Sequence, residues 1–337
     1  MNIHQQRYLP GLQLAVSQLE PAEQLGFLMA QQGIRRIFFV ACGAPNRVME
    51  SIQYWIDCYA VSVETHRFFP AEFIRQAPRR VDENSLVILM SDSGKTPEVL
   101  EAARFILDHY RCRLLAVTGR TESPLGQMCP LVIAHGEGAV GFEAKFMVLL
   151  AFLSGWMQGC GEWNLHKHIM TGLAALPSAM TDAEEQAEAR NLELATRYAN
   201  ENFYLVTGSG PSHPVAYSLG VCIMMEALWI KVFDGPAAEF FHGPFEVVDR
   251  SVPVMLFMGE DPSRPLAERV QRFCERFTDK LIQYDSREYP MLGIPSEARP
   301  ILAPYVLGAA SYRYAFHLAN LRGQPLSTRR YMGKEQY

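Results

Sequence analysis

Apolar and polar positions along the chain form two kinds of stretch that alternate. Short runs rich in β-branched and aromatic residues are followed by longer segments in which apolar residues recur at helical spacing. This alternation is typical of a parallel β-sheet with helices on both faces. The first half contains five strand candidates, at residues 35–43, 59–65, 85–94, 112–119 and 131–134. Helical patterns at 46–57 and 96–110 connect them.

The second half repeats this scheme. Its strand candidates are residues 202–210, a short run near 237–240, 252–260 and 280–285. Residues 214–233 predict the first long helix of this half, and residues 161–190 predict a helical connection between the halves. We therefore expect an α/β protein with two flavodoxin-like, doubly wound domains, each with three α/β/α layers. The expected domains are 1–165 and 166–337.

Composition and charge exclude several classes of protein. Of the 337 residues, 49% are apolar and 20% are charged, and the formal net charge is −5. This balance is typical of a soluble globular protein, and no basic block indicates a nucleic-acid partner. The apolar run at 145–160 is too short to span a bilayer and predicts a buried helix. No secretion signal is expected at the N-terminus. Seven widely spaced cysteines favour a reduced, cytoplasmic protein without a metal site.

A hydroxyl-rich stretch follows the third strand candidate. Ligands of open parallel sheets bind beyond the carboxyl ends of the strands, where "SDSGKTPE" (91–98) lies. Hydroxyl groups, backbone N–H groups and a helix that begins at Pro97 would meet there, which suits a phosphate group. The spacing differs from nucleotide-binding loops, so a small phosphoester is the expected ligand. An ordinary capped turn explains the pattern about equally well, and is the favoured interpretation of residues 118–125.

One acid interrupts the apolar helix predicted at 214–233. The residues that share the helical face of Glu226 are all apolar: Leu219, Cys222, Ile223, Trp229, Ile230 and Phe233. Burial of an unpaired carboxylate is costly, and desolvation raises its pKa toward the range that a general base requires. The alternative is a structural pair with a buried base such as Lys231. We favour the functional interpretation.

A histidine stands beside a Gly-Pro turn in "EFFHGPFE" (239–246). His242 is flanked by Glu239 and Glu246 and by several phenylalanines. Taken alone, this pattern favours simple packing of the imidazole between aromatic rings. An imidazole on a fixed turn can also transfer protons near neutral pH.

Four motifs in order resemble the sugar isomerase (SIS) domain family, whose members can have two such domains in one chain. They are "FFVACGAPN", "SDSGKTPE", "EFFHGPFE" and the C-terminal "TRRYMGKEQY". The likeness extends from about residue 25 to the end and is strongest to bacterial 6-phospho-deglycases, which act on sugar-amine (Amadori) compounds. The chain also resembles the isomerase domain of glucosamine-6-phosphate synthase.

The resemblance implies a role for each matching residue. Glu226 would be the general base, and His242 would be the acid that opens the sugar ring, which in the family is often contributed by the neighbouring subunit. Lys334 matches a Schiff-base lysine. The residues implied to bind the 6-phosphate are Gly43, Ser91, Ser93 and Thr96, and those implied to line the substrate are Cys42, Asp92 and Glu239. The implied reaction is cleavage of a phosphosugar-amine in a homodimer or larger assembly, without a metal or cofactor.

Two departures from the synthase favour a deglycase. Ala44-Pro45 stands where the synthase has hydroxyl residues after Cys-Gly, and Asn2 stands where glutamine-dependent synthases have a cysteine nucleophile. A synthase-like isomerase or aminotransferase stays open as an alternative. A non-catalytic sugar-phosphate sensor is the second alternative. Such sensors in transcriptional regulators normally carry a DNA-binding helix-turn-helix domain, and the roughly 25 residues before the first domain are too few for one. The identity of the amine stays open.

Overall fold

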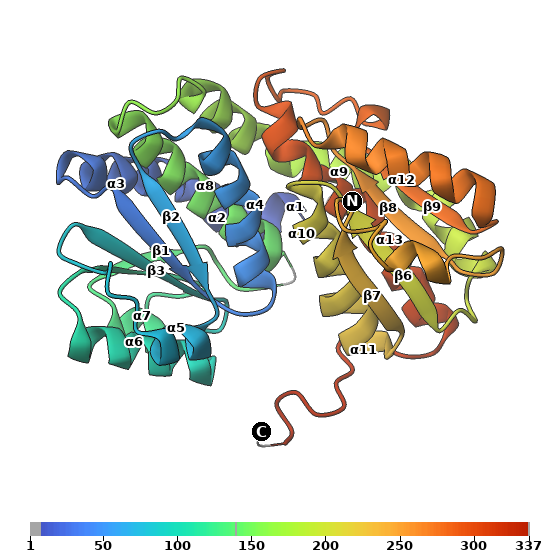
Figure 1. Cartoon of the computed structure of the whole chain (residues 1–337), viewed down its shortest axis with the longest axis horizontal. Coiled ribbons are helices and arrows are strands. Elements are labelled where there is room, and N and C mark those ends of the chain that lie inside the picture. Colours follow the sequence, from blue (N-terminus) through green and yellow to red (C-terminus); the bar gives the residue numbers. More distant parts are fainter. Residues whose placement is uncertain (1–7, 139, 336–337) are drawn as a thin grey trace. The chain divides into compact units, whose positions relative to one another are not determined.

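The chain forms two compact units, each built around one parallel β-sheet (Figure 1). The computed structural model describes residues 8–138 and 140–335, so Asn2 lies outside the described residues. The first unit comprises Met1–Ser178 and Gly293–Ala298, and the second comprises Ala179–Leu292 and Arg299–Tyr337. The expected α/β class with parallel sheets is confirmed.

The first sheet has the strand order β2-β1-β3-β4-β5, and every neighbouring pair is parallel. Its strands are β1 (Arg36–Val40), β2 (Glu64–Phe68), β3 (Ser85–Ser91), β4 (Arg113–Thr118) and β5 (Leu131–Ala134). This is the flavodoxin-like order, in which the chain reverses direction across the sheet between β1 and β3. All seven residues of β3 are buried, as expected for a central strand covered on both faces.

Helices cover both faces of this sheet (Figure 1). On one side lie α5 (Pro70–Gln76), α6 (Pro97–His109) and α7 (Pro124–Met128); on the other lie α3 (Leu19–Gln31), α4 (Ala44–Tyr59) and α8 (Gly141–Gly159). Two short helices, α1 (Tyr8–Gly11) and α2 (Gln13–Ser17), precede them. Fifteen consecutive residues of α8, from Glu143 to Met157, are buried, which confirms the predicted buried helix. No described helix combines the length and apolar content that a membrane crossing requires.

The second sheet has the order β7-β6-β8-β9 and is also parallel throughout. Its strands are β6 (Phe203–Gly208), β7 (Lys231–Pro236), β8 (Val254–Met258) and β9 (Leu281–Asp285). The helix α9 (His166–Arg197) leads into it, as expected from residues 161–190. The remaining helices are α10 (Ser212–Tyr217), the π-helix η1 (Ser218–Met225), α11 (Glu226–Leu228), α12 (Arg264–Phe277), α13 (Arg299–Leu321) and the short 3₁₀ helices η2 (Pro244–Val247) and η3 (Ser286–Glu288).

Three predicted boundaries were wrong. The second strand spans 64–68 rather than 59–65, and the strand expected near 237–240 is instead β7, at 231–236. The long helix expected over 214–233 ends at Leu228, because Trp229 adopts a left-handed conformation with φ of 57°. One continuous apolar run therefore contains the end of a helix and the start of a strand, and apolar periodicity alone does not separate the two.

Candidate active site

The hydroxyl-rich loop lies at the carboxyl end of β3, as predicted, and leads into α6 at Pro97. The Ser91 hydroxyl is buried and lies 2.8 Å from the hydroxyl of Thr96. The backbone N–H of Gly94 donates to the carbonyl of Ser91 (3.1 Å), and Gly94 has a φ of +62° that an L-residue rarely adopts. Ser93 is exposed. Backbone curvature thus presents hydroxyls beside the first turn of a helix.

A second loop, residues 118–125, braces the first. Thr118 and Ser123 form a hydroxyl pair at 3.1 Å, and Ser123 caps α7 by accepting from the N–H of Gly126. The N–H of Leu125 donates to the carbonyl of Gly94 at 3.0 Å. A Cβ atom on Gly94 would lie 2.3 Å from the Ser123 hydroxyl, so only glycine fits this junction. The loop is the capped turn that the sequence predicts, and it also fixes the position of Gly94.

Cys42 and Gly43 lie at the same edge of the first sheet, because β1 and β3 are parallel neighbours. Gly43 precedes α4 with a φ of +63°, and open space surrounds the position of a Cβ atom there. Cys42 is half-buried, and burial raises the pKa of its thiol, which stays protonated at neutral pH. The sheet edge therefore brings the predicted phosphate residues of the first unit together.

Asp92, predicted to line the substrate, contacts a lysine that sequence reasoning missed. Lys145 on α8 is 1% exposed, and its ammonium group donates to the Asp92 carboxylate. The imidazole of His135 lies 3.4 Å from the other carboxylate oxygen. Burial lowers the pKa of His135 to about 4, so this imidazole is neutral at neutral pH. The lone lysine within the apolar run "AKFMVLLAFL" was the pattern that could have revealed the pair.

Glu226 follows directly after the π-helix η1 in the second unit. π-Helical turns occur frequently at functional sites, because they add a residue to the turn and change side-chain directions. The side chain of Glu226 is 28% exposed, and its carboxylate lies 3.5 Å from the guanidinium of Arg329. Burial raises the pKa of this carboxyl group, and the neighbouring guanidinium opposes the increase.

The apolar stripe predicted around Glu226 is only partly present. Leu219 and Ile230 are buried, but Trp229 and Phe233 are exposed. The π-helix and the helix end at Leu228 disrupt the assumed spacing of 3.6 residues per turn. Lys231, considered as a structural partner, is exposed, and the partner of Glu226 is Arg329.

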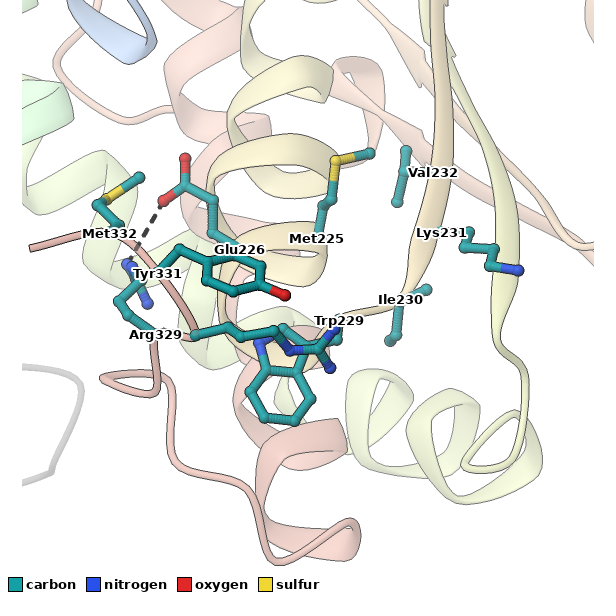
Figure 2. A pocket seen from close by; sticks show the side chains of 10 residues that line it. Met225, Glu226, Trp229, Ile230, Lys231, Val232, Arg329, Tyr331 and Met332 are labelled. Carbon is teal, nitrogen blue, oxygen red and sulfur yellow. Dashed lines mark ion pairs between the residues drawn. The ribbon is translucent and has the colours of Figure 1, made fainter. Parts of the chain in front are cut away.

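A pocket of about 410 Å³ adjoins this pair (Figure 2). Its lining is mostly apolar and comes from the end of the helix, β7 and the C-terminal tail: Met225, Glu226, Trp229, Ile230, Lys231, Val232, Arg329, Arg330, Tyr331 and Met332. In Figure 2 the Glu226 carboxylate points toward the tail, where Arg329 and Met332 lie. Glu226 is the one acid in the lining among the described residues.

Lys334 extends from the exposed end of this tail. Its ammonium group donates to the backbone carbonyl of Arg329 at 2.6 Å. The predicted Schiff-base lysine thus contacts the residue that pairs with Glu226, and it is absent from the lining of the pocket.

His242 is exposed and lines a different pocket of the second unit, of about 320 Å³. Its backbone N–H donates to the carbonyl of Glu239, which lines the same pocket with Thr207 and Pro244. Within one chain, Glu226 and His242 therefore lie in separate pockets. Among residues 8–138 and 140–335, no three His, Cys, Asp or Glu side chains are grouped as metal ligands.

Comparison with known proteins gives a consistent family. The SIS domain model matches residues 30–154. The chain is 35% identical over 319 residues to the fructosamine deglycase FrlB of Bacillus subtilis, covering 94% of this chain and 97% of that protein. It is 26% identical over 307 residues to the fructoselysine 6-phosphate deglycase of Escherichia coli, covering 90% and 87%.

Solved structures agree with this relation. A crystal structure of a candidate phosphosugar isomerase from Bacillus subtilis has a TM-score of 0.88 and 33% identity. The match covers 96% of this chain and 99% of the other. The chain therefore belongs to the SIS domain family, in the group that includes the fructosamine deglycase FrlB.

Proposed function

We propose that this protein is a deglycase that hydrolyses a 6-phosphorylated fructosamine to a hexose 6-phosphate and a free amine. The observation on which this rests most is the half-buried carboxylate of Glu226 at an apolar pocket, in a chain whose full-length relatives are named deglycases. A carboxyl group with a raised pKa in such a pocket is suited to act as a general base.

The hydroxyl-rich loop would bind the 6-phosphate. Ser91, Ser93 and Thr96 supply hydroxyl donors, and the first turn of α6 supplies backbone N–H groups. Gly43 leaves open space for a bulky anion at the same sheet edge. Cys42 and Asp92 would line the sugar nearby.

Glu226 would transfer the protons of the reaction. In the open-chain ketosamine, its carboxylate removes a proton from C1, and the electron pair of the C–H bond forms a C1–C2 double bond. The π pair of the C2 carbonyl moves to its oxygen, which takes up a proton from solvent and gives an enaminol. The C1–C2 π pair then takes up the proton at C2 while the nitrogen lone pair forms a C1–N double bond, giving a protonated imine that keeps the hydroxyl at C2. Water then adds to C1 and expels the amine, which leaves the aldehyde of the hexose 6-phosphate. Proton transfer of this kind accelerates a step by about 10²–10⁴-fold.

His242 would open the sugar ring before this chemistry by donating a proton to the ring oxygen. Its exposed position, in a pocket separate from that of Glu226, suits a residue that serves the active site of a second subunit. Glu239 lies beside it and would line the same region. We therefore propose a homodimer or larger assembly with shared active sites. The seven cysteines are all free thiols, which supports a cytoplasmic location.

The test compares two substrate sets with purified protein. Release of hexose 6-phosphate from fructoselysine 6-phosphate is measured by a coupled assay, beside formation of glucosamine 6-phosphate from fructose 6-phosphate and ammonia. We expect turnover of the fructosamine only. If the protein converts fructose 6-phosphate and ammonia but does not cleave fructoselysine 6-phosphate, the result would instead support the synthase-like reaction.

Glu226→Gln separates catalysis from binding. The amide has nearly the same shape but is not a base, so kcat is expected to fall by about 10²–10⁴-fold. Binding of hexose 6-phosphate, measured by calorimetry, should persist. Full turnover by this variant would reject Glu226 as the base.

A further inference from the structure

The C-terminal tail beyond α13 is attached at two residues that lie close to Glu226 in the sequence. The amide of Gln324 donates to the carbonyl of Ala227 at 2.6 Å. The guanidinium of Arg330 lies 4.0 Å from the centre of the Trp229 ring, a cation–π contact. Ala227 and Trp229 both follow closely after Glu226, so these attachments hold the intervening tail beside the carboxylate.

The orientation of Arg329 is set by the tail itself. Its guanidinium donates to the carbonyls of Leu326 (3.0 Å) and Thr328 (2.7 Å), and the side chain of Lys334 binds the carbonyl of Arg329. A planar guanidinium with two fixed hydrogen bonds has little freedom left. Its approach to Glu226 at 3.5 Å is therefore prearranged by the tail backbone.

Positive charge predominates around Glu226. The charged or titratable groups that line the pocket with it are Lys231 on β7 and Arg329, Arg330 and Tyr331 in the tail. Of these, Arg329 pairs directly with the carboxylate, and it opposes the increase in pKa that burial causes. Without it, the pKa of Glu226 would lie higher, and the carboxyl group would stay protonated, and unable to accept a proton, up to a higher pH.

We propose that Arg329 is a positioning residue for Glu226: it keeps the carboxylate ionised and fixed at the pocket, and Lys334 acts by fastening Arg329 rather than by bonding to the sugar. The proposal rests on the proposed role of Glu226 as the base. It assigns a function to the tail through two side chains that the substrate need not touch.

The test is the pH dependence of kcat/KM for fructoselysine 6-phosphate. In Arg329→Gln, the acidic limb of the profile should move to higher pH, so that activity falls more at pH 6 than at pH 8. Arg329→Lys should restore much of the limb, because it keeps the charge. Arg197→Gln is the matched control: it removes an exposed Arg–Glu pair on α9 with Glu193, and should leave the profile unchanged.

Other outcomes would overturn the proposal. An equal loss at every pH would indicate that Arg329 only supports the fold, and a gain at every pH would indicate that it blocks the base. If the wild-type protein cleaves no fructosamine phosphate, the proposed function fails. The ¹³C titration of the Glu226 carboxyl group then decides the effect of Arg329 separately: an unchanged pKa in Arg329→Gln would overturn the proposal.

Lys334 is tested by chemistry as well as kinetics. In Lys334→Gln, we expect a smaller shift of the acidic limb in the same direction as in Arg329→Gln. Borohydride reduction during turnover should leave Lys334 unmodified, as judged by peptide mass spectrometry. A sugar reduced onto Lys334 would show a Schiff base and refute its assignment as a fastening residue.

Discussion

Gly94 joins two loops at the carboxyl edge of the first sheet, and two separate constraints require glycine there. Its φ is +62°, and a Cβ atom would collide with Ser123. The left-handed backbone alone costs an alanine about 1–2 kcal/mol, and forcing atoms into packed space costs about 1–3 kcal/mol more.

Substitution can separate the two constraints. Gly94→Ala should lower the stability of the first unit by both amounts and weaken binding of hexose 6-phosphate. Gly33→Ala is the control, because Gly33 also has a positive φ (+83°) but nothing lies within 4 Å of a Cβ atom there. Gly33→Ala should lose only the stability that the backbone conformation contributes, and it should bind hexose 6-phosphate as the wild type does. Thermal unfolding and calorimetry measure both, and equal losses in the two variants would exclude the steric contribution.

For single residues, the sequence predicted which side chains lie at the proposed site but not which side chains pair with one another. The loop hydroxyls were expected at the end of β3 because strand order in parallel sheets determines which loops share an edge. Arg329 was not predicted as the partner of Glu226, because it reaches the carboxylate from the C-terminal tail. Lys231, much nearer in sequence, lines the same pocket but is exposed.

Among the elements, α8 is tied to the phosphate loop by one ion pair with unequal exposure. Lys145 is 1% exposed, whereas the side chain of Asp92 is 47% exposed. Removal of Asp92 should therefore destabilise the protein more than removal of Lys145, because only the charge of the lysine would be left unpaired in a site without water.

The two single variants should differ in stability. Asp92→Asn leaves a buried ammonium group without its counter-charge and should lower the free energy of unfolding by on the order of 3 kcal/mol. Lys145→Met leaves a half-exposed carboxylate that water can solvate, and should cost about 1 kcal/mol or less. Urea unfolding of the first unit measures both. Equal effects would mean that the ammonium group finds another partner or loses its proton.

Element types followed from the sequence more reliably than their ends. Buried central strands such as β3 combine β-branched residues with flanking turns, and they lie where predicted. β7 was predicted too far along the chain, near 237–240, because its residues continue an apolar helical run and only the left-handed Trp229 separates the two elements. The π-helix was not foreseen, since its extra residue per turn follows from packing rather than from composition.

The two compact units divide the proposed functions between them. The phosphate loop, its bracing loop and Gly43 all belong to the first unit, and Glu226, its tail and His242 all belong to the second. The duplicated architecture was evident from the repeated alternation of strands and helices. The sequence did not indicate that residues 293–298 belong to the first unit, because this segment lies far along the chain from the rest of that unit.

This division predicts where a phosphosugar product should act on the folded molecule. A ligand that binds only the folded state adds RT ln(1 + [L]/Kd) to stability, about 2.7 kcal/mol at one hundred times Kd. Hexose 6-phosphate should therefore slow hydrogen exchange at residues 91–97 and 118–125. Ser93→Ala should weaken this protection, since the exposed hydroxyl would be a phosphate donor. Glu226→Gln should keep it, because the base is not needed to hold the phosphate. Protection that is lost in Glu226→Gln but kept in Ser93→Ala would place phosphate binding in the second unit instead.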